Sequence, residues 1–441
     1  MSDNFDLKSA IFRVAEEMNI QCDDSLESSL SGMLGQTDPH VDCLLLKGDN
    51  LTALGRLSSA YYEKIDFCYI DPPYNTGQEF IYSDNKRKAQ KGIWGRHHDW
   101  LAFMLPRLVA VHALLKPDGV IAISIDDYEY AHLKILADHI FEPENYIATL
   151  VVCRSKNGKG SKAHVAVNHE YVLLYGKTSD ATVGGVSEGA HRVYDKSDSY
   201  GDYKLDGLFR KKGDASLKED RPSMYYPLYF AETGEVFAEK VNEHLQEVYP
   251  VDSQGVHRRW LWGLDKAKSE SWKLYASKKG VVYVKNYNSE NKKVKLRSLL
   301  DKPEYLTDRA TSEIKEIFGE KVFETPKPLN LIKDLVACCS PKDGLILDFF
   351  AGSGTTAEAV HVLNREEGGQ RKTILVEQDT PVKKEHIAFK QGFSKICDLT
   401  EFRVRAIAAR DPLYKMEAIF LQNDNDHSSR DRQQMLDLRP V

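Results

Sequence analysis

Short stretches of continuously apolar residues alternate with longer stretches of helical period in two separate parts of this chain. The first part holds such runs at 41–47, 64–70 and 119–126, and the second at 344–350 and 372–379. Strands that are apolar on both faces are typical of parallel sheets covered by helices. We therefore predict one α/β sheet built from two sequence-distant halves. A helical pattern spans 98–116, and Pro106 predicts a kink or a break within it.

The residues between these two parts differ from them in composition. They are rich in Gly, Ser, Asp, Lys and Tyr, and their strand-like pieces are short, which favours a separate β-rich domain inserted into the sheet. The predicted parts are a peripheral segment 1–40, a first α/β half 41–178, an insert 179–319, a second α/β half 320–410 and a C-terminal tail 411–441, in which 423–434 are polar and expected to be disordered.

A glycine-bearing turn joins a strand to a helix within 345–360. Gly352 and Gly354 permit a tight turn and close approach of a ligand, and Thr355 and Thr356 can cap the helix that follows. The turn lacks the third glycine of a dinucleotide fingerprint and the Gly-Lys-Ser/Thr of a phosphate loop. Asp348 and Glu377 end neighbouring apolar runs, where acids are placed to accept hydrogen bonds from ribose hydroxyls.

The run ending at Ile70 is followed by Asp71, Pro72, Pro73 and Tyr74. The prolines fix φ and remove two N–H donors, so a carboxylate and a main-chain carbonyl become a rigid pair of acceptors. Tyr74 adds a flat ring for stacking. Such acceptors suit an exocyclic amine on a heteroaromatic ring, because they favour a pyramidal nitrogen with a free lone pair. The sequence therefore predicts a catalytic turn at this strand end.

The two motifs together resemble those of the DNA amino-methyltransferases that use S-adenosylmethionine. Asp71 to Tyr74 matches the catalytic motif of that family, and Asp348 to Thr356 matches its cofactor motif. The catalytic motif comes first, as in the circularly permuted β class. The resemblance implies a Rossmann-like methyltransferase sheet with an inserted target-recognition domain, adenine N6 as the methyl acceptor, and base flipping from duplex DNA.

The resemblance also extends to smaller segments. Residues 48–50 resemble an acidic motif near the cofactor adenine, and 324–328 resemble a segment that helps enclose the cofactor. Residues 167–171, 219–222 and 225–227 are similar to modification subunits of type III restriction systems, which implies a possible homodimer and a possible restriction subunit. The cofactor-binding residues so implied are Asp49, Asp71, Lys327, Asp348, Phe349, Ala351, Gly352, Gly354, Thr355 and Glu377.

Basic segments are the candidates for DNA contact. A polar stretch 84–99 lies near the catalytic motif, a second basic stretch spans 154–162, and residues 256–302 hold 13 Lys and Arg against 4 Asp and Glu, a balance of +9. Phe80 and Tyr82 could close the pocket or belong to the core. The predicted DNA contacts are Lys86, Arg87, Lys88, Arg96, Arg154, Lys156, Lys159, Lys162, Arg258 and Arg259, and the stretch 84–99 could equally be a solvated loop.

Composition and motif order leave alternatives open. Cytosine N4, RNA adenine or a protein amide could be the acceptor, although the basic insert argues against a protein substrate. A degenerate methyltransferase that only binds DNA is a further class, against which the intact motifs argue. The chain shows no secretion signal, no membrane-length apolar stretch and no metal-ligand spacing, and its seven cysteines are scattered, so we expect a cytoplasmic protein with reduced thiols.

Overall fold

The computed structural model describes residues 6–22, 26–30, 34, 37–38, 40–76, 93–157, 159–160, 165–187, 194–288 and 293–421. The chain divides into two compact units. The larger unit comprises Met1–Val186 and Lys295–Val441, and the inserted unit comprises Ser187–Val294. The inserted unit is shorter at both ends than the 179–319 expected from composition, because Val183 and Val186 before it and Leu296 and Leu300 after it pack into a core of the larger unit.

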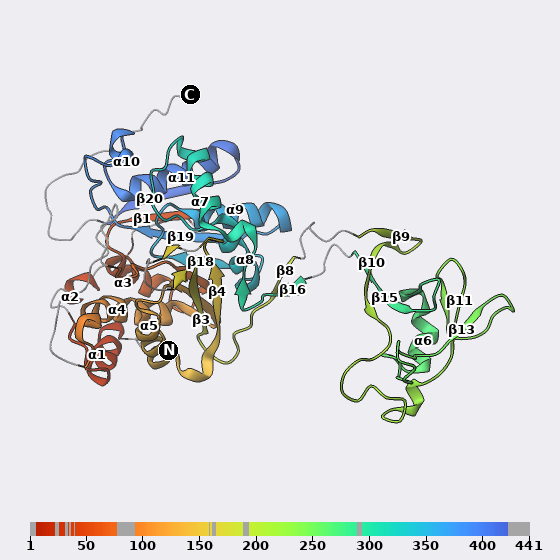
Figure 1. The fold of residues 1–441 in the computed structure, drawn as a ribbon. Helices are drawn as coiled ribbons and strands as arrows, with labels where there is room; N and C mark the ends of the chain where they lie inside the picture. Colours follow the sequence, from red (N-terminus) through yellow and green to blue (C-terminus); the bar gives the residue numbers. More distant parts are fainter. Residues whose placement is uncertain are drawn as a thin grey trace. The chain divides into compact units, whose positions relative to one another are not determined.

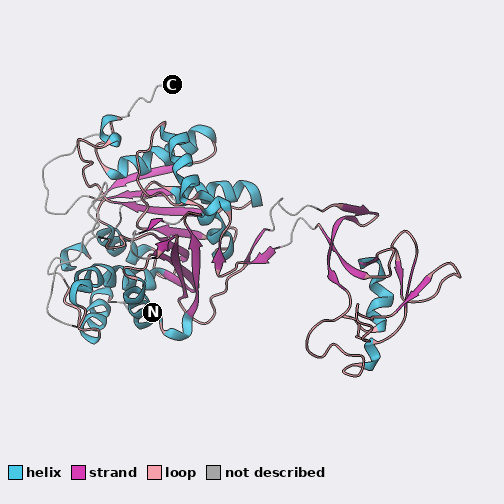
Figure 2. Ribbon diagram, viewed as in Figure 1, coloured by secondary structure: helices cyan, strands magenta, loops and turns pink. Residues whose placement is uncertain are grey.

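One nine-stranded sheet organises the larger unit (Figures 1 and 2). Its order is β17-β4-β7-β3-β2-β18-β19-β1-β20. The strands are β1 (Cys43–Lys47), β2 (Ile65–Ile70), β3 (Leu115–Ile125), β4 (Tyr146–Cys153), β7 (His169–Gly176), β17 (Leu299–Leu300), β18 (Leu345–Asp348), β19 (Lys372–Glu377) and β20 (Met416–Phe420).

The predicted joining of two distant halves occurs at the centre of this sheet. β2 pairs in parallel with β18, with Phe67 opposite Ile346, and β18 pairs in parallel with β19. β7 runs antiparallel to both β3 and β4, so the sheet is mixed rather than wholly parallel. The predicted α/β class and the permuted order of the two halves agree with this arrangement.

Helices cover both faces of the sheet, and alternate strand residues point to opposite cores. Cys68 and Ile70 of β2 face one core with α1 (Leu7–Glu17), α3 (Asn50–Ala60), α4 (His98–Leu114) and α5 (Tyr130–Phe141). Phe67 and Tyr69 face the other core with α8 (Leu329–Cys339) and α9 (Thr355–Glu367). The expectation of strands buried on both faces is therefore met.

Three segments differ from the sequence-based expectation. α4 continues through Pro106, so the proline does not break the helix. α1 packs into the core beside α4 instead of remaining peripheral, and residues 416–420 of the expected tail form β20 beside β1. The polar stretch 423–434 lies outside the described residues. α7 (Thr307–Phe318) and α11 (Ile396–Arg410) share a small core of the larger unit, which also contains α2 (Leu26–Ser29), α10 (Ile387–Lys390), β5 (Lys159–Gly160) and β6 (Ala166–Val167).

The inserted unit is rich in β-structure, as predicted. One sheet has the order β14-β15-β10-β9 and a second the order β12-β11-β13. Trp260 and Phe209 stack at 5.2 Å within its core. The elements are β9 (Lys196–Asp198), β10 (Gly201–Leu208), β11 (Leu228–Phe230), β12 (Val236–Phe237), β13 (Gln246–Val248), α6 (Leu264–Glu270), β14 (Leu274–Ala276) and β15 (Val282–Tyr287). Among the helices that the structure describes, none has the length and apolarity to cross a bilayer.

Candidate active site

Three acids meet at one edge of the central sheet. Asp71 follows β2, Asp348 ends β18 and Glu377 ends β19, and these three strands are neighbours that run in the same direction. Parallel strands bring their carboxyl ends to a common edge, so the three side chains line one cleft. Of the predicted residues, the cleft is lined by Asp71, Pro73, Lys327, Asp348, Ala351, Gly352, Thr355 and Glu377.

The glycine turn is held by the acids beside it. The N–H of Gly352 donates to Glu377 Oε2 at 2.5 Å, and Asp348 accepts from the N–H of Phe350 at 3.1 Å and from the Thr356 hydroxyl. Gly352 has a φ of +53°, and a Cβ there would lie 3.3 Å from the Phe323 ring. Both the backbone conformation and the narrow space therefore favour glycine at this position.

Desolvation changes the protonation of the two strand-end acids. Burial raises the pKa of Asp348 to about 7, against the opposing hydrogen bond from Thr356. It raises the pKa of Glu377 to about 8, although hydrogen bonds from the N–H groups of Gly352 and Gln378 favour the charged form. Both groups thus take up or release protons near neutral pH, where a ligand could shift the balance.

Some residues predicted to bind the cofactor do not line the cleft. The side chain of Phe349 is buried in the core, and Gly354 begins α9 with a φ of +80° against α11. Asp49 caps α3 by accepting from the N–H of Thr52 at 2.9 Å. For these three positions the structure gives folding roles. Pro72 is also buried and does not line the cleft.

Several lining residues were missed by the sequence reasoning. Phe350, Ser353 and Thr356 lie within the quoted cofactor motif, and Gln378 follows Glu377 directly, so the motif itself could have indicated them. Phe323 precedes the recognised segment 324–328. Ile396 carried no local signal, because it comes from α11, which only the fold brings to the cleft.

The catalytic turn is supported from behind by α4. Trp100, which is fully buried, donates from Nε1 to the carbonyl of Pro73 at 2.7 Å. The Tyr74 hydroxyl donates to Glu170 Oε2 at 3.2 Å. These contacts, added to the fixed φ of two prolines, hold the turn rigidly.

The ammonium of Lys327 contacts two residues of the catalytic turn and the nearby Glu170. Its Nζ lies 2.9 Å from Asp71 Oδ1, donates to the Tyr74 hydroxyl at 2.7 Å, and lies 3.3 Å from Glu170 Oε2. Burial raises the pKa of Asp71, while the Lys327 ammonium opposes that rise and the Glu170 carboxylate adds to it. Lys327 was predicted to bind the cofactor, and the structure also joins it to the catalytic turn. Glu170 lies in the segment 167–171, which resembles type III modification subunits, but the sequence does not indicate a role for it.

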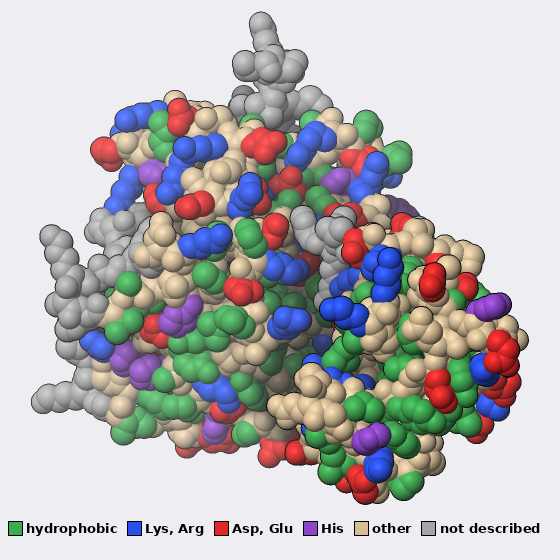
Figure 3. Space-filling view, turned by 45° about the vertical axis from the view of Figure 1, so that its right-hand side comes forward, with side chains coloured by type: hydrophobic (Ala, Val, Ile, Leu, Met, Phe, Trp, Pro, Cys, Tyr) green, Lys and Arg blue, Asp and Glu red, His purple; other side chains and the backbone are tan. Residues whose placement is uncertain are grey.

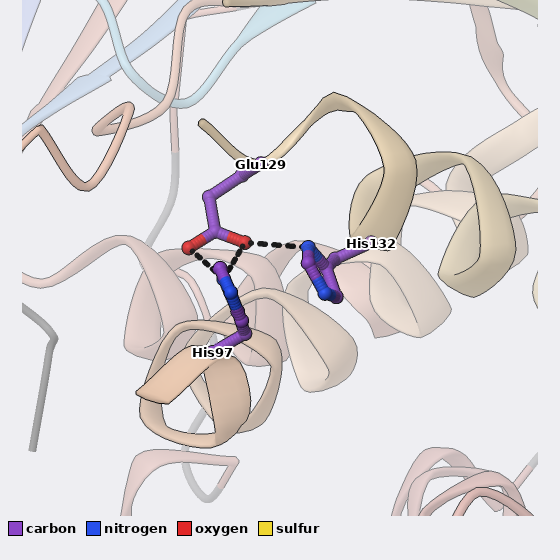
Figure 4. Close-up of side chains that lie close together, drawn as sticks. All are labelled: His97, Glu129 and His132. Carbon is purple, nitrogen blue, oxygen red and sulfur yellow. Dashed lines mark hydrogen bonds and ion pairs between the residues drawn. The ribbon is translucent and has the colours of Figure 1, made fainter. Parts of the chain in front are cut away.

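A second cluster lies beside the end of the same turn. His97 and His132 approach the carboxylate of Glu129, as Figure 4 shows, and these three side chains are close enough together to hold a metal ion. The sequence did not indicate this cluster, because Glu129 and His132 lie at the start of α5 whereas His97 ends the short helix Gly95–His97, and only the fold brings the two together. The side chain of Asn75, which follows Tyr74, donates to the same carboxylate at 2.5 Å.

The predicted DNA contacts of the larger unit are only partly described. Arg96 and Lys156 are exposed and Arg154 is half-buried, with its Nε 3.5 Å from Glu170 Oε2. Arg154 thus lies next to the catalytic cluster. The side chain of Lys159, and Phe80, Tyr82, Lys86, Arg87, Lys88 and Lys162 as a whole, lie outside the described residues.

In the inserted unit the structure alters the predicted contacts. Arg259 is 8% exposed and donates to the carbonyl of Ala215 at 2.7 Å, so its prediction as a DNA contact was wrong: its charge serves the fold. Arg258 pairs with Asp252 at 2.9 Å. Trp260, one of the interleaved aromatic residues, belongs to the core.

The positive balance of residues 256–302 is also partly cancelled. Lys268 pairs with Glu239 and Lys285 with Asp198, and both acids precede the counted window. The face in Figure 3 accordingly carries basic and acidic side chains next to each other. A charge count over a window of sequence therefore overstates the positive charge of the folded surface.

The strand ends combine a glycine turn, paired acids and a rigid carboxylate turn, which defines an α/β enzyme with a nucleoside-bearing cofactor. Comparison with known proteins makes the class specific. Residues 65–391 match the N6_N4_Mtase family model, described as DNA methylase. The chain is 54% identical over 373 residues to the type II methyltransferase M.KpnI of Klebsiella pneumoniae, covering 84% of this chain and 89% of that protein. This protein belongs to the N6_N4 DNA methylase family and is a DNA methyltransferase.

Further similarities accompany these. The Mod subunit of the type III restriction-modification enzyme EcoPI, from Escherichia phage P1, is 34% identical over 403 residues, which cover 82% of this chain. The aligned part spans 62% of that subunit's length. Among solved structures, PvuII DNA methyltransferase (cytosine-N4-specific) matches 85% of this chain and 94% of its own, with 13% identity and a TM-score of 0.40.

The cofactor of the reaction is S-adenosylmethionine. Its positive sulfonium and amino groups and its ribose hydroxyls need acceptors and negative charge, which the carboxylates of Asp71, Asp348 and Glu377 offer in one cleft. Gly352 leaves the space that backbone approach to such a ligand requires. The residues at the strand ends therefore fit this cofactor.

Proposed function

We propose that this protein methylates adenine N6 in duplex DNA after flipping the base out of the helix. One observation carries the proposal. The Asp71 carboxylate lines the cleft at the end of β2, with its buried Oδ1 2.9 Å from Lys327 Nζ, so a charged acceptor is held in place at the edge where a ligand enters. A buried acceptor of this kind is suited to an incoming N–H donor. The exocyclic amine of a flipped base provides one.

The residues of the turn have separate roles in the reaction. Asp71 and a main-chain carbonyl accept the two N6 hydrogens and favour a pyramidal nitrogen, and Tyr74 stacks on the base. S-Adenosylmethionine supplies an electrophilic methyl group: the N6 lone pair forms the N–C bond as the S–C bond breaks, which leaves S-adenosylhomocysteine. N6 then releases one proton, which the Asp71 carboxylate, with its raised pKa, is placed to accept.

Asp348 and Glu377 are assigned to the cofactor. Their carboxylates accept from its ribose hydroxyls and amino group, while Gly352, Ala351 and Thr355 shape the cleft around it. We assign two roles to Lys327, since it lines the cleft and its ammonium favours the ionised form of Asp71.

Cytosine N4 is the alternative acceptor. Both acceptors are exocyclic amines, so the same turn could serve either, and the family description covers both. An aspartate at position 71, rather than serine, favours adenine by resemblance to adenine-N6 enzymes. The amine is the shared chemistry, and nucleoside analysis distinguishes the two bases.

Partners beyond DNA belong to the same proposal. The inserted unit recognises the target sequence, and Arg96, Arg154 and Lys156 contact phosphates. The enzyme works in the cytoplasm as the modification component of a restriction-modification system. Similarity to a type II methyltransferase supports action alone, and similarity to type III Mod subunits supports a homodimer with a separate restriction subunit.

The test uses the full chain, duplex DNA of mixed sequence and S-adenosylmethionine with a labelled methyl group. The DNA is digested to nucleosides, which are separated and identified by mass. Labelled N6-methyladenine supports the proposal. N4-methylcytosine as the sole product would replace adenine by cytosine, and transfer to RNA or protein in preference to DNA would overturn the proposed substrate.

A further inference from the structure

The backbone at the end of the catalytic turn adopts an unusual conformation. Asn75 has a φ of +58°, in the left-handed region, and its side chain is fully buried. Asparagine tolerates this region better than most residues, but the conformation persists only when surrounding contacts fix it. One contact that fixes the side chain is the hydrogen bond from Asn75 Nδ2 to Glu129 Oε1, at 2.5 Å.

Glu129 is a buried acid with several donors. It precedes α5, is 1% exposed, and accepts from His97 Nδ1, which lies 2.9 Å from each carboxylate oxygen (Figure 4). Arg96 Nε donates to His97 Nε2 at 3.3 Å, so we assign the His97 proton to Nδ1. A carboxylate excluded from water needs such donors, because its charge would otherwise be unfavourable there.

The same residues could be considered as metal ligands. However, Asn75 and His97 already donate to the carboxylate, and the rings of His97 and His132 stack at 3.7 Å with an interplanar angle of 16°. The nitrogens of both rings face Glu129, with His132 Nδ1 3.3 Å from Oε2, but the lone pairs of parallel stacked rings run side by side, whereas a zinc site needs lone pairs that converge tetrahedrally. A hydrogen-bonded hub fits this geometry better than a metal centre.

We propose that Glu129 is a positioning residue for methyl transfer. It fixes Asn75, and through Asn75 it fixes the direction in which the chain leaves Tyr74, while His97 fixes Glu129 itself. Tyr74 and Asp71 then face the amine in one geometry. This inference rests on the proposed function, since it takes residues 71–74 as the turn that binds the target base.

The test exchanges the two partners of the bond. Asn75→Asp places two carboxylates together, and Glu129→Gln removes the charge that His97 and Asn75 bind. In the double variant the new carboxylate at 75 accepts from the new amide at 129, whose oxygen still accepts from His97. Glu17→Gln is the matched control, because Glu17 also binds a histidine, His139 at 2.8 Å, but lies on the exposed face of α1.

Single-turnover methyl transfer and the affinity for S-adenosylhomocysteine are measured for each variant. We expect each single variant to lower the transfer rate by about 100-fold with unchanged affinity, as a displaced reactive geometry does. The double variant recovers most of the rate, which a general loss of stability would not produce. Full rates in both single variants, or a double variant as slow as the singles, would overturn the inference.

The zinc content of the protein tests the alternative that His97, Glu129 and His132 form a metal site. Wild-type protein is dialysed against Zn²⁺ and then against buffer, and its zinc is determined. We expect no retained zinc and no effect of EDTA on the transfer rate. One retained equivalent that Glu129→Gln abolishes would overturn the hydrogen-bonded hub. An inactive wild-type enzyme would refute the proposed function, whereas active single variants refute only the role of Glu129.

Discussion

The ammonium of Lys327 lies 2.9 Å from a carboxylate oxygen of Asp71, although 256 positions of sequence separate the two residues. A cation at this distance favours the ionised carboxylate, which burial disfavours. The proposed chemistry needs Asp71 ionised, so the balance between these two effects sets the pH range of the enzyme.

Lys327→Met should therefore shift the acid limb of the pH–rate profile to higher pH. Loss of the cation raises the Asp71 pKa further, so the carboxylate stays protonated over more of the acidic range. Single-turnover rates between pH 5 and 9 measure this shift. Lys333→Met, on α8 and paired with Glu366 at 2.8 Å, is the control and should leave the limb in place. An unchanged acid limb in Lys327→Met would refute the coupling.

Asp71→Ala should abolish transfer while binding of S-adenosylhomocysteine largely survives. Removal of one preorganised polar group that acts on the reacting atom costs about 10²–10³ in rate, or more. The exposed Asp343→Ala serves as the control. Rates are compared by labelled methyl transfer, and near-normal turnover in Asp71→Ala would exclude the assigned role.

Binding of S-adenosylhomocysteine should release protons near pH 7. The pKa of Glu377 is about 8, so this acid is largely protonated in the free protein, and ribose hydroxyls that donate to it favour its ionised form. The affinity should consequently rise as the pH increases through that pKa. Calorimetry in buffers of different ionisation enthalpy counts the protons. Glu377→Gln should remove its share of the release, and equal release in that variant would contradict the assignment.

Arg403→Met should destabilise the larger unit by about 3 kcal/mol, because it removes the buried one of the two cations that pair with Glu358 and leaves only the more exposed Arg410. Arg403 Nε donates to Glu358 Oε2 at 2.7 Å, and its Nη1 donates to the Thr355 hydroxyl at 2.9 Å beside the cofactor turn. Denaturant unfolding measures the loss. The double variant Glu358→Leu/Arg403→Met removes both charges and should be less destabilised than Arg403→Met alone; the reverse order would argue against the buried pair.

Arg154→Ala should weaken DNA binding in a salt-dependent manner. Loss of one phosphate contact reduces the slope of log K against log[salt] by about 0.9. Fluorescence anisotropy with a labelled duplex at several salt concentrations measures it. Arg365→Ala, on α9 with 68% of its side chain exposed, is the control. Equal slopes for Arg154→Ala and wild type would remove Arg154 from the interface.

Local pattern carried most of the architecture. Apolar runs, helical periods and turn residues predicted β1, β2, β3, β18 and β19, the helices α4 and α9, and the strand-end positions of Asp71, Asp348 and Glu377, because burial on both faces and chain reversal leave a direct mark on composition. The helix break expected at Pro106 does not occur, because tertiary packing holds the helix, with Leu105 and Leu108 fully buried on either side of the proline. Arg259 was predicted as a DNA contact although it is buried, because the charge of a residue does not reveal whether its side chain is exposed.

The sequence by itself determined the fold class, the two motifs and their order along the chain. Only the tertiary structure decided that Lys327 and Glu170 join Asp71 and Tyr74, and that Asn75, Glu129 and His97 form one hydrogen-bonded hub. The reason is physical. Periodicity records which face of an element is buried, whereas a contact between side chains depends on sheet order, register and helix packing, which bring together residues from distant parts of the chain.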